Sequence, residues 1–134
     1  MEMITWDDSL SVGVQQFDAE HRELIKFVNK LNQSLKIGGA QKTMEDILTG
    51  LIKYTVIHFT HEEDYMVLYD YPGYDAHRKE HEELKKKVTD FHERFTAQKA
   101  AFSLELMIFL RDWLINHIQK SDMAYKDFFQ SKGV

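Results

Sequence analysis

Side chains that commonly bind metals recur along this sequence at helical spacing. They are His21, His58, Glu62, His77, His81, His117 and Asp122. Residues four apart lie one above the other on a helix. The pair His58 and Glu62 could therefore bind a metal ion, and so could the pair His77 and His81. Five imidazoles and two carboxylates exceed the ligand set of one tetrahedral ion, and the chain has no cysteine. The inventory predicts a centre that holds two metal ions.

Each predicted helix has apolar residues three and four positions apart, which form an apolar stripe along one face. The candidate ligands continue these stripes. The first helix is expected to begin at Asp18, a favourable N-cap residue, and to stop at the glycines at 38–39. The second opens with Thr43 and Asp46, a variant of the capping box, and ends at the sequence YPGY at 71–74. In both helices a histidine takes a place on the stripe where leucine or isoleucine stands elsewhere.

The second half of the chain repeats this pattern. A third helix is predicted from about Asp75 to Phe95, and a fourth starts near Ser103 and carries His117. Residues 10–14 are the only candidate for a strand. Short connections favour antiparallel neighbours, so the fold class is all-α, an up-down-up-down four-helix bundle with an irregular N-terminal arm. We expect one domain, residues 1–134, with the arm at 1–17 and the bundle at 18–134.

In an antiparallel bundle, the start of the first and third helices and the end of the second and fourth lie at one end. All the candidate ligands fall in those four places. A single histidine on an apolar stripe is more often a hydrogen-bonded core residue than a ligand. Here the substitution occurs on all four stripes, and burying these groups together without a counter-charge would be costly. Metal binding is therefore the favoured interpretation.

Three histidines need separate comment. His117 and Asp122 are five residues apart, about 140° around a regular helix, so they cannot form the clamp that a four-residue step allows. A helix irregularity, or a bridging position of Asp122, would solve this geometry. His61 and His92 lie off the ligand-bearing stripes, and we expect both to be solvated surface residues.

Composition limits the classes of partner. The chain has 134 residues, with 17 basic and 22 acidic side chains mixed along it and a net charge of -5, so nucleic acid is not an expected partner. No segment approaches the roughly 18 uninterrupted apolar residues of a membrane span, and the N-terminus lacks the pattern of a signal peptide. We expect a cytoplasmic monomer without membrane insertion.

Other metal and cofactor classes fit poorly. Carboxylate-rich di-iron bundles use Glu-x-x-His, and no histidine here has a glutamate three residues before it. The zinc-protease pattern fails because Tyr65 and Lys85 stand where its second histidine would follow the His-Glu pairs. Haem would leave the two carboxylates unexplained. The sequence also lacks a glycine-rich phosphate loop and a nucleophilic cysteine.

Several motifs resemble the hemerythrin family, in particular its bacterial single-domain members. The resemblance runs through WD at 6–7, HFTHEE at 58–63, YPGYDAHRKEH at 71–81 and HIQKSD at 117–122. It implies two non-haem iron ions (Fe2+/Fe3+) with a bridging oxo or hydroxo group. All seven ligand positions match, including the five-residue step before Asp122.

The resemblance also implies how the ligands are shared. His77, His81 and His117 would bind one iron, and His21 and His58 the other, with Glu62 and Asp122 bridging both. The iron with two histidines would keep an open position for dioxygen. The apolar side chains that flank the ligands are expected to admit dioxygen and restrict water; they are Phe59, Trp113, Leu114 and Ile118.

The expected function is reversible dioxygen binding, for storage or delivery to an oxygen-consuming enzyme, without catalytic turnover. Two rivals use the same centre: an enzyme that scavenges peroxide or nitric oxide, and an oxygen or redox sensor that signals through a partner. Tyr54, Tyr65 and Tyr69 are possible hydrogen-bond donors for the enzyme. The chain ends at Val134 with no output domain attached, which favours storage or delivery over sensing.

Overall fold

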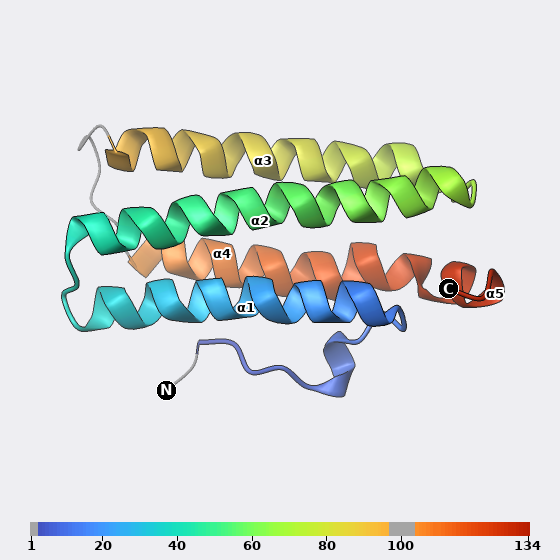
Figure 1. Cartoon of the computed structure of the whole chain (residues 1–134), viewed down its shortest axis with the longest axis horizontal. Helices are drawn as coiled ribbons and strands as arrows, with labels where there is room; N and C mark the ends of the chain where they lie inside the picture. The colour runs from blue at the N-terminus through green and yellow to red at the C-terminus, as the bar shows by residue number, and fades with distance from the viewer. Residues whose placement is uncertain (1–2, 97–103) are drawn as a thin grey trace.

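The computed structural model describes residues 3–96 and 104–134. Four long α-helices lie side by side in this part of the chain: α1 (Gln15–Lys36), α2 (Gln41–Leu68), α3 (Tyr74–Thr96) and α4 (Leu104–Asn116) (Figure 1). The shorter elements are η1 (Asp8–Leu10) in the N-terminal arm and η2 (His117–Asp122), η3 (Met123–Tyr125) and α5 (Lys126–Ser131) after α4. The predicted all-α four-helix bundle is confirmed.

Successive long helices run in opposite directions (Figure 1). The start of α1, the end of α2, the start of α3 and the end of α4 therefore share one end of the bundle, the end at which α5 lies. Helix α1 packs against both α2 and α4, and α2 packs against α3. The chain thus brings four distant segments of sequence to one place, as the antiparallel arrangement predicts.

Apolar side chains at three- and four-residue spacing fill the centre of the bundle. The buried ones on the long helices include Leu24, Ile25, Val28, Leu31, Leu48, Leu51, Leu84, Val88, Met107, Leu110 and Leu114. Burying each side chain of this size contributes about 1.5–3 kcal/mol relative to leaving it exposed. This packing fixes the helices from which the polar side chains at the ligand end project.

Helix α1 begins three residues earlier than predicted. Its N-cap is Val14, which makes no side-chain cap. Asp18 instead lies within the first turn, and its carboxylate accepts hydrogen bonds from Ser11 Oγ at 2.6 Å and Val12 N at 2.8 Å. Asp18 therefore ties the N-terminal arm to the helix, and its expected role as N-cap is wrong.

The predicted capping box of the second helix is also wrong. Helix α2 starts at Gln41 after the N-cap Ala40, which makes no side-chain cap. Thr43 and Asp46 lie inside the helix, where Asp46 pairs with Lys42 across one turn at 3.0 Å. The helical structure is interrupted between α2 and α3, as expected.

Two other predictions concern the candidate strand at 10–14 and the start of the fourth helix. The residues that the structure describes contain no strand: in the candidate strand at 10–14, Leu10 ends η1, and residues 11–14 form an irregular segment in which Gly13 has a φ of 75°. Only glycine adopts this backbone conformation without strain. The predicted start of the fourth helix near Ser103 lies outside the described residues.

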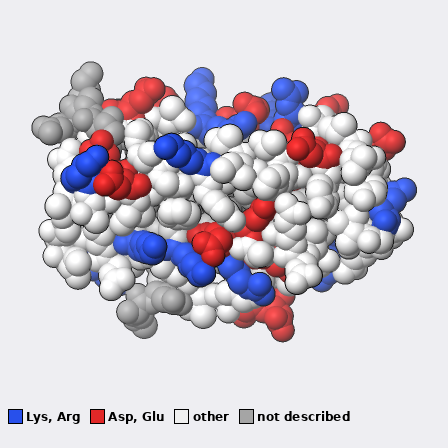
Figure 2. Space-filling view, viewed as in Figure 1, with Lys and Arg blue, Asp and Glu red and all other residues white. Residues whose placement is uncertain are grey.

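Lys, Arg, Asp and Glu side chains are interspersed on the face shown in Figure 2. This mixture agrees with the sequence, in which basic and acidic residues are mixed along the chain. Among the helices in the described ranges, none has the length and apolar character that crossing a membrane requires.

Candidate metal centre

All seven predicted ligands meet in the core at one end of the bundle. Each is at most 5% exposed. Their ligand atoms form two overlapping groups, and within each group every atom lies within 4.8 Å of the others. One group is Glu62, His77, His81, His117 and Asp122, and the other is His21, His58, Glu62 and Asp122. The two carboxylates belong to both groups.

The local structure of the last segment explains the five-residue step. Residues 117–122 form a π-helix, in which hydrogen bonds join residues five apart. The wider turn places Asp122 on the same side as His117, so that Asp122 Oδ1 lies 3.1 Å from His117 Nε2. The predicted irregularity is confirmed.

Asp122 faces imidazoles of both groups. Its Oδ2 lies 3.1 Å from His21 Nε2, and its Oδ1 lies 2.8 Å from His77 Nε2. Two ligand atoms that each sit about 2.1 Å from one ion, at right angles, are about 3 Å apart. The distances around Asp122 therefore suit a carboxylate that binds one ion together with His21 and a second ion together with His77.

Glu62, like Asp122, faces imidazoles of both groups. Its Oε1 is 3.5 Å from His58 Nε2 and 3.3 Å from His81 Nε2, while its Oε2 is 3.7 Å from His21 Nε2. The fully buried Tyr125 donates a short hydrogen bond of 2.5 Å to Oε2. Burial, together with Glu62, raises the pKa of Tyr125 well above its usual value, so Tyr125 keeps its proton and donates it to this bond.

Several buried polar atoms of the centre have no hydrogen-bond partner in the described part of the chain. They are both ring nitrogens of His21, Nε2 of His77, Nδ1 of His117, Oε1 of Glu62 and both oxygens of Asp122. Buried polar atoms are nearly always paired, and an unpaired one is costly. Nitrogen and oxygen atoms that lack hydrogen-bond partners in this arrangement fit as ligands of a pair of cations.

The charges of the centre point the same way. Burial disfavours the ionised forms of Glu62 and Asp122, yet the surrounding imidazoles hold the pKa of both carboxyls well below its ordinary value. Although burial favours neutral imidazoles, the two carboxylates raise the pKa of His21 and of His77 to about 10. The carboxylate pair thus attracts positive charge into the core, which metal ions or protons can supply.

The two histidines set aside in the sequence analysis are only partly exposed. His61 Nδ1 lies 2.6 Å from Glu20 Oε2, and the side chain of His61 is 40% exposed. His92 Nε2 lies 2.9 Å from Thr49 Oγ1 and is half-buried. The prediction that both are solvated surface residues holds in part: both are partly exposed, and each also contacts a residue on a neighbouring helix.

Aromatic rings pack directly on the ligand imidazoles. Phe59 stacks on His81 with ring centroids 3.7 Å apart and an interplanar angle of 4°, and Trp113 stacks on His117 at 4.5 Å and 13°. These contacts restrict the orientation of both imidazoles and keep one side of the centre apolar.

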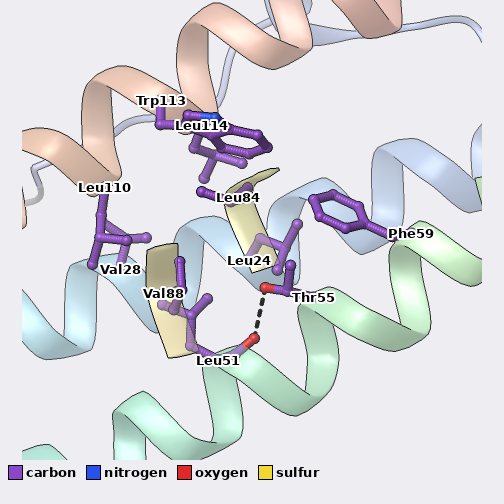
Figure 3. A pocket seen from close by; sticks show the side chains of 10 residues that line it. All are labelled: Leu24, Val28, Leu51, Thr55, Phe59, Leu84, Val88, Leu110, Trp113 and Leu114. Atoms are coloured by element: carbon purple, nitrogen blue, oxygen red, sulfur yellow. Dashed lines mark hydrogen bonds between the residues drawn. The ribbon is translucent and has the colours of Figure 1, made fainter. Parts of the chain in front are cut away.

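An apolar cavity of about 30 Å³ lies beside these rings, between the four long helices (Figure 3). Its wall is formed by Leu24, Val28, Leu51, Thr55, Phe59, Leu84, Val88, Leu110, Trp113 and Leu114. The hydroxyl of Thr55 donates to the carbonyl of Leu51 at 2.7 Å, so it offers no free proton to the cavity. This volume exceeds the roughly 10–15 Å³ that one water needs, but the wall gives water almost no polar partner.

The chain matches known proteins over most of its length. The family model described as Hemerythrin HHE cation binding domain matches residues 12–129. A bacteriohemerythrin of Stenotrophomonas maltophilia is 33% identical over 95% of this chain and 82% of the relative, and a myohemerythrin of Theromyzon tessulatum is 32% identical over 93% and 92%. A solved structure of wild-type hemerythrin, 32% identical, superposes with a TM-score of 0.89 and covers 93% of this chain and 96% of that chain.

Proposed function

Because this chain belongs to the hemerythrin family, we propose that it binds dioxygen reversibly at a non-haem di-iron centre and stores it or delivers it to an oxygen-consuming enzyme. The observation that carries the proposal is the pair of overlapping ligand groups, with Glu62 and Asp122 common to both. A pair of carboxylates shared by two sets of imidazoles is suited to hold two ions close together. One isolated ion would not require shared carboxylates.

The ligands divide as the overlapping groups suggest. His77, His81 and His117 would hold one iron, and His21 and His58 the other. Glu62 and Asp122, which belong to both groups, would be shared between the two. The group with two histidines offers fewer protein ligands, so a further ligand would bind on that side.

Iron, when bound, supplies the electrons that reversible dioxygen binding draws on. The protein provides five imidazoles and only two anionic carboxylates, a set that stabilises high oxidation states of iron less than a carboxylate-rich set does. Tyr125 donates to Glu62 and holds the orientation of that carboxylate. We infer that this ligand set favours binding of dioxygen over cleavage of its O–O bond.

The apolar cavity gives the centre a place through which a small apolar molecule can approach. Its wall includes Phe59 and Trp113, which stack on ligand imidazoles, and the buried Leu114. Leu84 and Trp113 line both this cavity and a surface groove beside α3. Dioxygen enters such a space more readily than water does, which slows oxidation of the iron pair.

A reversible colour change tests the proposal. The protein is loaded with Fe2+ without air, its iron content is measured, and its visible absorption is recorded when air is admitted and then removed. We expect two irons per chain and a band that appears with air and disappears without it. A band that never reverses, or a chain that binds a single iron, would contradict the proposal.

We also propose that the centre works without catalytic turnover. Tyr65, one of the tyrosines considered as a donor, donates to Gln16 Oε1 at 2.9 Å and so is directed to α1. Pure iron-loaded protein is expected to consume added peroxide no faster than the same concentration of free iron does. Sustained consumption over many turnovers would favour the scavenging enzyme instead.

A further inference from the structure

Glu20 connects a proposed iron ligand to the surface of the bundle. It lies on α1 next to His21 and is 8% exposed. Its Oε1 is 2.6 Å from His58 Nδ1, and its Oε2 is 2.6 Å from His61 Nδ1. Gln16 Nε2 also donates to Oε2, at 3.3 Å. Both oxygens of one buried carboxylate are therefore occupied by side chains that bracket it.

The outer nitrogens of the ligand imidazoles are not treated alike. His58 Nδ1 faces Glu20, and His81 Nδ1 faces Glu63 Oε2 at 3.0 Å. Within the described part of the chain, Nδ1 of His21 and Nδ1 of His117 have no hydrogen-bond partner. Each proposed iron thus has a histidine whose Nδ1 lies within hydrogen-bond distance of a carboxylate: His58 for the two-histidine ion and His81 for the three-histidine ion. Glu80 Oε1 lies farther from His117 Nδ1, at 3.9 Å.

Glu20 contacts the outer nitrogen of a proposed ligand imidazole. A carboxylate that accepts the Nδ1 proton of a ligand histidine fixes the ring orientation, leaves Nε2 free for the metal and makes the imidazole a stronger ligand.

We propose that Glu20 is the positioning residue of the two-histidine ion, that it aims His58 Nε2 at the centre, and that His61 and Gln16 hold it in place. This inference rests on the proposed di-iron function and extends it to residues outside the ligand set. The two-histidine ion has the fewest protein ligands, so it depends more on each of them than the other ion does. Glu63 has the corresponding role for His81 at the other ion.

Iron removal by a chelator tests this role. Full-length protein loaded with iron is challenged with a chelator, and the release of each ion is followed over time. Loss of a group that supports a metal ligand weakens metal binding by about 10- to 100-fold. We expect Glu20→Ala to release one ion that much more readily while the other leaves as in the unaltered protein. Glu20→Gln should release it less readily than Glu20→Ala, because the amide oxygen still accepts from His58 Nδ1.

A second carboxylate variant shows whether the two effects fall on different ions. Glu63→Ala is expected to release one ion early as well, and the double variant to release both. If Glu20 and Glu63 supported the same ion, the double variant would still release only one early. Glu23→Ala serves as the matched control, because Glu23 is an exposed glutamate on α1 that pairs with Lys26. The helical signal of each variant is recorded to verify folding.

Several outcomes would overturn the proposal. If Glu20→Ala left release of both ions unchanged, accelerated both equally, or matched Glu20→Gln, the result would show that Glu20 does not position His58. His61→Asn should reproduce a smaller part of the Glu20→Ala effect, and none of it would contradict the role of His61. If the unaltered protein held two irons but gave no reversible band, dioxygen binding would fail while the role of Glu20 stood.

Discussion

The two ends of the bundle use the same helices and the same stripe positions in opposite ways. At one end the stripes present imidazoles and carboxylates to each other. Toward the other end they present side chains such as Leu31, Leu48, Val88 and Met107, all buried. Position on the stripe decides that a side chain is buried. Residue type then decides whether apolar packing or bound charge must stabilise it.

This difference predicts different sensitivities. The apolar end is stabilised by area removed from water and by close packing, which require nothing from outside the chain. The ligand end contains buried polar atoms without hydrogen-bond partners, so its free energy depends on what cation or proton it holds. Perturbing either end should therefore leave the other largely intact.

The largest effect is expected from the shared carboxylate Asp122. Because Asp122 faces imidazoles of both groups, we expect Asp122→Ala to abolish binding of both irons, as measured by iron content after loading and gel filtration. Asp112→Ala is the matched control, since Asp112 is an exposed residue on α4, the helix that directly precedes the π-helix. Full iron content in Asp122→Ala would remove Asp122 from the proposed ligand set.

Acid is expected to empty the ligand end before it unfolds the apolar end. Imidazoles must be neutral to bind metal, and in the metal-free protein the pKa of His21 and of His77 is raised to about 10. Because that value lies above neutral pH, protons already compete for these two imidazoles at pH 7 and compete more strongly with each unit of acidification, so iron retained after dialysis should decrease steadily from about pH 7 to about pH 4. Constant retention across this range would contradict metal binding through these imidazoles.

A cavity in the apolar end should have the converse effect. Leu31 is fully buried in α1, and Leu31→Ala is expected to lower the free energy of unfolding by about 2–5 kcal/mol, from lost transfer free energy and the cavity that remains. Denaturant unfolding measures this loss. Iron content at saturation should stay the same, and a halved iron content would show that the two ends are coupled.

The smallest expected change lies at the boundary between the two ends. Leu114 is buried and lines the apolar cavity beside the proposed ligands, so Leu114→Ala should widen access and raise the rate of autoxidation several-fold. The rate is read from the loss of the oxygenated band in air. Leu110→Ala, which lines the same cavity one helical turn earlier, is expected to have a weaker effect. Equal rates in all three proteins would exclude Leu114 from control of access.

The fold and the ligand set were largely predictable from the sequence, because both rest on spacing along single helices. The four- and five-residue steps located the side chains on one face, and antiparallel order brought the faces together. The π-helix at 117–122 was foreseen only as an irregularity, from the mismatch between a five-residue step and a regular helix. That these residues bind iron stays a prediction.

Other features depend on contacts between helices, which spacing in one helix does not encode. Glu20 contacts His58 and His61 on α2, and Tyr125 contacts Glu62 across the core, so none of their roles had a sequence signal. The start of α1 was misplaced because Asp18 hydrogen-bonds backward to the arm rather than capping the helix. In each case a partner distant in sequence decided the role of a familiar residue type.

The π-helix at 117–122 also constrains how this sequence can change. The five-residue step between His117 and Asp122 brings the two side chains together only because this segment is a π-helix. If the same residues adopted regular α-helical hydrogen bonds, Asp122 would lie about 140° around the helix from His117, and the centre would lose a carboxylate that faces both groups. A one-residue deletion within the segment would instead leave a four-residue step, which a regular helix places on one face. Regular helical geometry and the shared carboxylate are therefore compatible here only if the segment also loses a residue.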